Sequence, residues 1–193
     1  KKHGIYVQAG FILFDDNTTF EELKENYEFL REYDWIITKG IFSEMFAADG
    51  TLYTEKLKKE DKIIKNDVYD NNKYDIVDPK VKLAYNALKR WHKSHMKLYD
   101  MIIDPISSPK AIDSTGEKEF YDLYFQLKLL DLDFMQIVLE EIEHGISEEN
   151  LNQLITTQIC KHARFYDEMN YKGKNLCNKY GLNYDGKENP FIR

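Results

Sequence analysis

The chain has little cysteine and little proline, and these shortages exclude several kinds of site. Its 193 residues include only two cysteines and four prolines. Cys160 and Cys177 form no CxxC motif, so we expect two reduced structural thiols, although the sequence leaves a disulfide between them open. Two cysteines cannot supply the three thiolate ligands of an iron–sulfur cluster. No GxGxxG, P-loop or GxSxG motif is present, so those chemistries have no support.

Long apolar runs and basic clusters are also missing. No stretch approaches the ~20 apolar residues of a membrane helix, and the first ten residues lack the apolar region and cleavage site of a signal peptide. The net charge of −7 argues against a nucleic-acid surface, which needs clustered lysine and arginine. We therefore expect a cytoplasmic protein with neither nucleic acid nor a membrane as a partner.

What is present predicts a globular α/β start. Hydrophobic residues make up 42% of the chain and aromatic residues 14%, which is ordinary for a packed domain. Residues 4–14 are predicted to form a strand, and its core "AGFILF" is nearly continuously apolar, which is typical of a parallel strand covered on both faces. Thr18 or Thr19 can open a helix through a capping box with Glu21 or Glu22. A second apolar run over 34–46 predicts another strand.

Two strands alternating with two helices predict right-handed parallel βα units, which need neighbouring strands to be stable. The second helix follows Thr51, a candidate N-cap, and Asn71-Asn72 is expected to form a turn. Pro79 suits the first position of a helix. The composition becomes helical near residue 78, so the predicted domains are 1–78 and 79–193.

Three helices are predicted in the second domain. The first spans 81–103 and is ended by the two prolines of "DPISSPK". The second starts at Ser114 or Thr115 and ends at Gly145, and the third runs from Ser147 to about Tyr180. The aromatic residues of the second of these helices are expected in the core; they are Phe120, Tyr121, Tyr124, Phe125 and Phe134.

The segment "GIYVQAGFILFDDNTTFEELKENYEFLRE" carries the strongest motif. It resembles the fifth strand and following helix of the catalytic barrel in radical S-adenosylmethionine (radical SAM) enzymes, most closely the branch that often carries a cobalamin-binding domain. The next segment, "FSEMFAADGTLYTEKLKKEDKI", is similar to the sixth strand and helix start of that barrel. Matching residues are Gly10, Phe11, Ile12, Phe14, Asp15, Thr18, Thr19, Glu21, Glu22, Leu23, Glu25, Asn26, Phe29 and Leu30. Asp16 and Leu52 stand where the family often has proline.

The resemblance implies a fold, cofactors and a reaction. The fold class is α/β, with two parallel βα units from a partial TIM-type barrel followed by a mainly α-helical region. The implied cofactors are S-adenosylmethionine and a [4Fe-4S] cluster, with cobalamin possible for methyl transfer. The CxxxCxxC motif that holds this cluster is absent from the 193 residues. We therefore expect the chain to be the C-terminal portion of such an enzyme, inactive alone, with the missing N-terminal part as its partner.

Residues on the fifth strand of that family line the adenine pocket. The corresponding positions are Gly10, Ile12, Phe14 and Asn17, of which the first two agree with the family pattern and the last two depart from it. Ile12 and Phe14 can equally be plain core residues. Gln8 and Lys39 are polar within apolar runs, so they are expected either in a substrate cavity or at an exposed edge. No catalytic residue is identified.

The helical region contains two histidine motifs. His92 and His95 form HxxH, and Glu141 and His144 form ExxH. A di-iron bundle needs a second ExxH, which is missing, so no metal site is predicted. Trp91, His92, His95 and Tyr99 can line a substrate channel, although a satisfied surface patch is the expectation.

A second reading is a non-catalytic helical module that binds proteins through amphipathic, tyrosine-rich helices, with a small α/β cap. In the enzyme reading the substrate is a small molecule or a peptide of unknown identity. The unpaired edge of an incomplete sheet favours a homodimer in either case.

Overall fold

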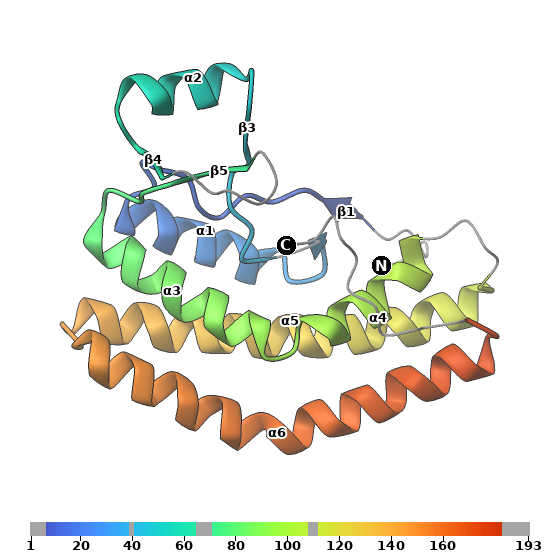
Figure 1. The fold of residues 1–193 in the computed structure, drawn as a ribbon. Helices are drawn as coiled ribbons and strands as arrows, with labels where there is room; N and C mark the ends of the chain where they lie inside the picture. The colour runs from blue at the N-terminus through green and yellow to red at the C-terminus, as the bar shows by residue number, and fades with distance from the viewer. Residues whose placement is uncertain (1–6, 39–40, 65–70, 108–111, 183–193) are drawn as a thin grey trace. The chain divides into compact units, whose positions relative to one another are not determined.

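The chain packs as two compact units. The computed structural model describes residues 7–38, 41–64, 71–107 and 112–182 (Figure 1). The first unit, which we call the mixed unit, comprises residues 1–32 and 36–86, and the second, the helical unit, comprises 33–35 and 87–193. Helix α3, Pro79–Lys93, begins in the mixed unit and ends in the helical unit. These units are defined by packing alone, so the domain boundary at residue 78 stays a prediction.

The mixed unit opens with a parallel βαβ arrangement. Strand β1, Gln8–Ala9, pairs in parallel with β2, Ile37–Thr38, and helix α1, Phe20–Glu32, connects them. A further parallel bridge joins Phe14 to Glu44. The predicted parallel pairing is therefore confirmed, but the long strands are wrong. In the described residues the parallel sheet has two strands and does not form a barrel.

The strands are short because much of the apolar run over residues 4–14 is exposed where the structure describes it. Leu13 and Phe14 are buried, but Ile12 is 50% exposed. A parallel strand of the barrel type is covered on both faces, whereas Val7, Gln8, Gly10 and Ile12 of this run are exposed. The remaining described backbone of the run is irregular, held by bonds such as those from the Leu13 and Phe14 amides to the Ser43 carbonyl.

A small antiparallel sheet follows in the same unit. Its strands are β3, Ala47–Ala48, β4, Ile63–Ile64, and β5, Asn71–Tyr74, in the order β3-β5-β4. Helix α2, Leu52–Lys59, lies between β3 and β4 in sequence. The turn expected at Asn71-Asn72 is wrong, because both residues pair with β3.

Helix caps in the mixed unit follow the predicted chemistry. The Thr19 amide donates to Glu22 Oε2 at 2.8 Å and the Glu22 amide to Thr19 Oγ1 at 3.2 Å, which is a capping box. Thr51 caps α2 by accepting from the Thr54 amide. Asp78 accepts from the amides of Lys80 and Val81 at the start of α3, and its other oxygen accepts from the Phe20 amide at the start of α1.

The helical unit contains three further helices in contact with one another. They are α4, Met96–Ser107, α5, Ser114–Glu143, and α6, Glu148–Lys179 (Figure 1). Gly145, with φ of +83°, ends α5, and Ser147 caps α6 through the Asn150 amide, both as predicted. Asp113, rather than Ser114 or Thr115, caps α5.

The single helix predicted over 81–103 is wrong. A turn at Ser94 and His95 divides it into α3 and α4, and Ser94 Oγ donates to the Trp91 carbonyl there. Pro105 lies inside α4, near its end, where a missing amide disrupts little of the helix. Because of the turn, the His95 ring points into the core of the unit, where its side chain is buried.

Aromatic residues fill this core. Phe120, Tyr121, Tyr124 and Phe134 are buried as predicted, and Phe125 is half-buried. Trp91 is fully buried and stacks on Phe134 with ring centroids 4.0 Å apart. The stacking of Trp91 on Phe134 packs the end of α3 against α5.

Candidate functional site

Three of the residues predicted to bind S-adenosylmethionine line one pocket of the mixed unit. The pocket has a volume of about 280 Å³. Ile12, Phe14 and Asn17 line it, with Asp15, Thr18 and residues of α1. Its lining is mostly polar at the helix end, where Glu22, Glu25 and Asn26 contribute. A ligand pocket usually measures ~300–1,000 Å³, so this one suits a part of a larger ligand.

The other predicted positions in this unit lie elsewhere. Gly10 is exposed and does not line the pocket, and a Cβ at this position would meet no atom within 4 Å. Gln8 lies in β1 and is exposed, which fits the edge placement rather than a cavity. Lys39 lies outside the described residues. The structure thus brings together Ile12, Phe14 and Asn17, but not Gly10 or Gln8.

Asp15 and Asp16, which follow Phe14, accept hydrogen bonds from other groups of the protein. Asp15 Oδ1 accepts from the Asn17 amide and from the Thr18 hydroxyl, which forms an Asx turn. Asp16 is 1% exposed and accepts from Lys62 Nζ at 2.6 Å and from the Tyr53 hydroxyl at 3.1 Å. Burial acts to raise the pKa of Asp16, but the bonds from Lys62 and Tyr53 outweigh it and lower the pKa. These contacts give both aspartates a structural role.

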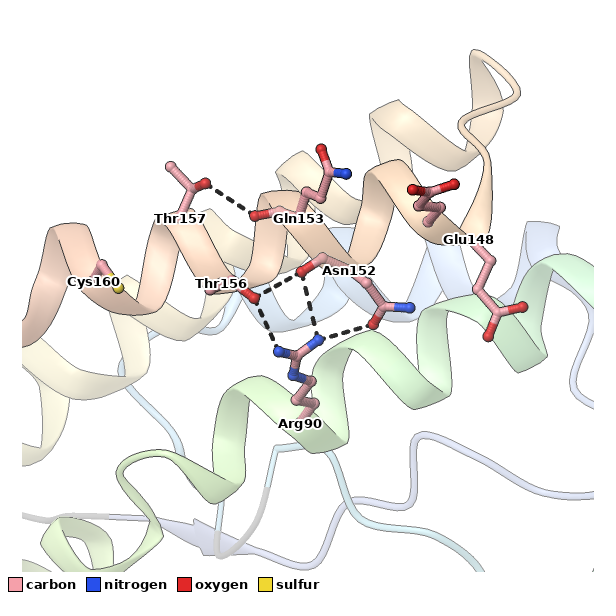
Figure 2. Close-up of a pocket in the computed structure, with 8 residues that line it drawn as sticks. Arg90, Glu148, Asn152, Gln153, Thr156, Thr157 and Cys160 are labelled. Atoms are coloured by element: carbon pink, nitrogen blue, oxygen red, sulfur yellow. Dashed lines mark hydrogen bonds between the residues drawn. The ribbon is translucent and has the colours of Figure 1, made fainter.

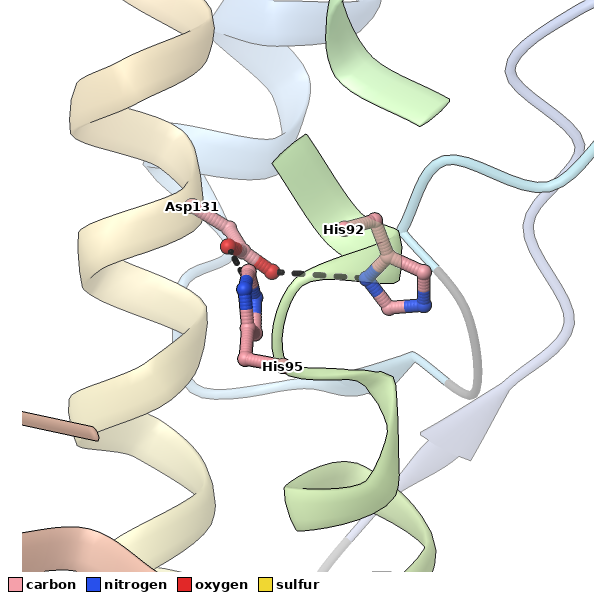
Figure 3. A group of neighbouring side chains, drawn as sticks. All are labelled: His92, His95 and Asp131. Carbon is pink, nitrogen blue, oxygen red and sulfur yellow. Dashed lines mark hydrogen bonds and ion pairs between the residues drawn. The ribbon is translucent and has the colours of Figure 1, made fainter. Parts of the chain in front are cut away.

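A second and more deeply buried polar group lies in the helical unit. We call it the Asp131 cluster and define it as Trp91, His92, His95, Tyr99 and Asp131. Asp131 Oδ1 accepts from Trp91 Nε1 at 2.7 Å and from His95 Nε2 at 2.9 Å, and Oδ2 accepts from the Tyr99 hydroxyl at 2.6 Å. His92 Nδ1 lies 3.9 Å from Oδ2 (Figure 3).

Separate segments of backbone supply these side chains. Trp91 and His92 come from the last turn of α3, His95 from the turn after it, Tyr99 from α4 and Asp131 from α5. The surface patch expected for the first four residues is wrong. Trp91 and Asp131 are 0% exposed, His95 3% and Tyr99 5%. The cluster therefore lies in the core of the helical unit rather than on its surface.

The electrostatics of the cluster centre on an ionised carboxylate. Burial acts to raise the pKa of Asp131, but His95, His92 and the Tyr99 hydroxyl together outweigh it and lower the pKa. Burial and the adjacent Asp131 charge raise the pKa of Tyr99 well above its usual value, so its hydroxyl stays protonated and donates. Burial lowers the pKa of His92 to about 4 despite the Asp131 charge. His92 is thus neutral at pH 7.

His95 is oriented at both ring nitrogens. Nε2 faces Asp131 Oδ1 at 2.9 Å, and Nδ1 lies 3.1 Å from Ser94 Oγ. Tyr166 of α6 stacks on the ring, with centroids 4.7 Å apart. The hydroxyl of Tyr166 is buried, and no hydrogen-bond partner lies within bonding distance of it in the described part of the chain. A ring held in this way has little freedom to rotate.

Asp131 is a functional candidate that the sequence motifs did not indicate. The HxxH motif identified His92 and His95, but the carboxylate lies on another helix, 36 positions from His95. A signal was present, since Asp131 occurs in the apolar segment "LKLLDLDFMQIV" four residues after Leu127 and four before Met135. An acidic residue at helical spacing with buried apolar residues requires internal partners. The ExxH residue His144 is exposed at the end of α5.

Lys128, one turn before Asp131, is another buried charge in the helical unit. The residue is 0% exposed, and its Nζ donates to the Tyr33 carbonyl at 3.2 Å. Burial lowers the pKa of Lys128 to about 8, although Asp34 opposes the shift. Buried lysines are tolerated when the amine can lose its proton or find acceptors. The same spacing signal was present in the sequence, because Lys128 lies four residues after Tyr124 and four before Leu132, which are both buried.

A wide cleft lies along the first half of α6. Its volume is about 1120 Å³, and its lining includes Arg90, Asn152, Thr156 and Cys160. Arg90 donates to Asn152 Oδ1 and to Thr156 Oγ1, each at 2.9 Å (Figure 2). The Arg90 guanidinium is thus already held by protein groups. Cys160 is exposed, Cys177 is buried, and both are free thiols.

Comparison with models of known protein families, with curated proteins and with solved structures found no significant match. No helix within the described ranges is long and apolar enough to cross a membrane. The residues and their geometry are therefore the basis for assigning a function.

Proposed function

We propose that this chain is the C-terminal part of a radical SAM enzyme, of the kind often associated with cobalamin. The observation that carries the proposal is the parallel pairing of β1 with β2 across α1. The segment that resembles the family's fifth strand and helix thus leads into a parallel neighbour, as a βα step of a barrel would. The residues "FD", "TT", "EEL" and "EN" of the motif stand at this step.

The pocket beside α1 supports a role in binding the adenine end of S-adenosylmethionine. Ile12 is half exposed toward solvent and also lines the pocket. Phe14, which is buried, and Asn17 line the same pocket. An exposed apolar side chain beside polar groups suits a flat aromatic ring with a polar rim. Gly10 and Gln8 have no part in the proposed adenine site.

The described residues fit the nucleotide part of the cofactor but not the cluster. A [4Fe-4S] cluster of this family needs three cysteines, whereas Cys160 and Cys177 are the two cysteines of the chain. The cluster ligands are therefore assigned to another part of the same enzyme. When bound, such a cluster supplies the electron that cleaves S-adenosylmethionine. Cobalamin, if used, and the small-molecule or peptide substrate would also need that part.

The test uses the full-length protein, reconstituted with iron and sulfide without oxygen. We expect visible absorbance from a [4Fe-4S] cluster and formation of 5′-deoxyadenosine on addition of S-adenosylmethionine and a reductant. Ile12→Ala should weaken S-adenosylmethionine binding about tenfold, since a buried ligand contact of ~1.4 kcal/mol is lost. Val77→Ala is the matched control, because Val77 is 61% exposed and does not line the pocket.

A full-length protein that lacks a CxxxCxxC motif, or forms neither cluster nor 5′-deoxyadenosine, would refute the enzyme proposal. The chain would then be better described as the protein-binding helical module. Equal binding by the Ile12 and Val77 variants would instead remove only the adenine assignment.

A further inference from the structure

The Asp131 cluster contains the donor atoms of a transition-metal site. One nitrogen from each of His92 and His95 and one oxygen of Asp131 lie within 4.8 Å of one another (Figure 3). Imidazole nitrogen and carboxylate oxygen are the ligands of zinc and of non-haem iron in proteins. The three side chains leave different segments of backbone, so the fold of the helical unit brings them together.

The donor atoms lie within 4.8 Å of one another, which is wider than the spacing of ligands on one metal, so binding requires a side chain to move. Two ligand atoms ~2.1 Å from a tetrahedral metal are about 3.4 Å apart. His92 Nδ1 and Asp131 Oδ2, at 3.9 Å, are too far apart for a hydrogen bond and slightly too far for this geometry. The His92 side chain is 18% exposed, so a small rotation of this ring can close the distance. His95 Nε2 and Asp131 Oδ1, at 2.9 Å, share a proton that a metal would replace.

The surroundings already contain the hydrogen bonds that orient metal ligands. In metal sites the second nitrogen of a ligating histidine is usually hydrogen-bonded, and so is a ligating carboxylate. Nδ1 of His95 lies 3.1 Å from Ser94 Oγ, which leaves Nε2 for the metal. The Asp131 carboxylate receives bonds from Trp91 and Tyr99 at 2.7 and 2.6 Å.

Charge favours a cation at this position. Within the described residues, the side chains that lie against the Asp131 carboxylate are those of Trp91, His92, His95 and Tyr99, and none of them is a lysine or an arginine. A buried carboxylate costs several kcal/mol unless a positive charge balances it. A divalent ion between the carboxylate and the two imidazoles would provide that charge. Entry is from the side of His92, the most exposed member of the cluster.

We propose that His92, His95 and Asp131 bind one divalent first-row transition-metal ion, of the zinc or ferrous-iron class. Three protein ligands leave a position for water or for an outside ligand, which is the arrangement of reactive rather than purely structural sites. The site is separate from the cluster and the S-adenosylmethionine pocket proposed above. It stands or falls independently of them.

Cobalt provides the direct test, because Co²⁺ replaces zinc and ferrous ions and its visible absorbance reports coordination. The purified 193-residue chain is first stripped with a chelator and then titrated with Co²⁺, and bound Zn²⁺ is measured separately by dialysis. We expect one ion per chain and a visible band that Zn²⁺ removes. His92→Gln should weaken binding at least tenfold, since even the loss of a hydrogen bond to a metal ligand costs ~10–100-fold.

His144→Gln is the matched control, because His144 is exposed at the end of α5 and far in sequence from the HxxH motif. It should bind both metals as the wild type does. Circular dichroism of His92→Gln checks that the helices are retained. The proposal is overturned by a wild-type chain that binds neither ion at millimolar concentration, or by a folded His92→Gln that binds as tightly as the control. The cluster would then be a hydrogen-bond network alone.

Discussion

Among the described residues, the most buried aspartates of the two compact units are balanced in different ways. Asp16 in the mixed unit is 1% exposed and contacts Lys62 at 2.6 Å and Lys56 at 3.8 Å. Asp131 in the helical unit is 0% exposed and is surrounded by imidazole, indole and phenol donors. A lysine partner brings its own positive charge. Asp131 instead depends on several weaker donors that must all be in place.

This contrast distinguishes a network balanced by lysines from one formed by imidazole, indole and phenol groups. The lysines that reach Asp16 are partly exposed, with Lys62 20% and Lys56 45% accessible, so that network faces solvent and ties loops together. The groups around Asp131 hold it in the interior, and contacts at both ring nitrogens restrict the His95 ring. Groups that are fixed in position, buried and able to lose protons are those that functional sites use.

Replacing Asp131 should produce the largest effect. Asp131→Asn keeps the shape of the side chain but replaces one acceptor oxygen with an NH₂ group, which faces the donors of Trp91, His95 and Tyr99. We expect about 3–5 kcal/mol lower stability, because buried donors lose their acceptor. Hydrogen exchange measured on peptides of α3, α4 and α5 should report the loss. Asp133→Asn, an exposed position two residues along the same helix, should change protection by less than about 0.5 kcal/mol. Equal effects at both positions would contradict the contrast between buried and exposed carboxylates.

Replacing Asp16 should have a smaller effect in the mixed unit. Asp16→Asn removes a charged bond to Lys62 that is partly exposed, so we expect a loss of about 1–2 kcal/mol. The control is Asp61→Asn, since Asp61 is exposed and has φ of 54°, a conformation that asparagine tolerates. Protection of α2 peptides against exchange is the measurement.

Lowering the pH should weaken the bond between Asp16 and Lys62 in the wild-type chain. The pKa of Asp16 is lowered in the folded state, so its contribution is present above the unfolded pKa and is lost as the pH falls through the folded value. Stability of α2 should therefore decrease between about pH 4 and pH 2, and Asp16→Asn should flatten this part of the profile. An unchanged profile in the variant would show that the lysine contacts do not stabilise the fold.

Local signals in the sequence predicted the ends of the elements well. The capping box of Thr19 and Glu22, the Ser147 cap and the turn at Gly145 each depend on residues within four positions of one another. The parallel direction of β1 and β2 was also predictable, because a helix connects them. Pairing between residues far apart in the sequence was not predictable in this way. Asn71 and Asn72 look like a turn until β3 provides partners.

In the candidate site too, local features were predictable from the sequence and contacts between distant residues were not. HxxH is a local pattern that drew attention to His92 and His95, although the sequence predicted a surface patch there and no metal site. Their burial and the role of Asp131 depend on the turn at Ser94 and on how α5 packs, and neither is encoded in the spacing of the histidines. The pocket beside α1 shows the same limit, since Ile12 and Asn17 line it but Gly10 does not.

The buried Lys128 predicts a change of stability at alkaline pH. Its pKa is lowered to about 8 from a model-peptide value of 10.5, so between these values the unfolded chain binds a proton that the folded chain does not. Stability then rises with pH, by at most about 1.4 kcal/mol per pH unit. We expect this rise between about pH 8 and pH 9.5, below the range where tyrosines ionise. Lys128→Met should abolish it, and Lys118→Met, at an exposed position of α5, should leave it intact.

The smallest expected effect tests whether a single local contact in the helical unit behaves independently of the Asp131 cluster. Ser147 Oγ accepts from the Asn150 amide at 3.2 Å, at an exposed helix start. Ser147→Ala should cost about 0.5–1 kcal/mol, because an amide of the first turn loses its acceptor. Ser147→Asp retains an acceptor and adds a charge that favours the positive end of the helix, so it should restore the stability. Exchange at the first turn of α6 should follow these differences, while amides beside Asp131 should not. A loss of protection around Asp131 in Ser147→Ala would show that the caps and the buried cluster are coupled.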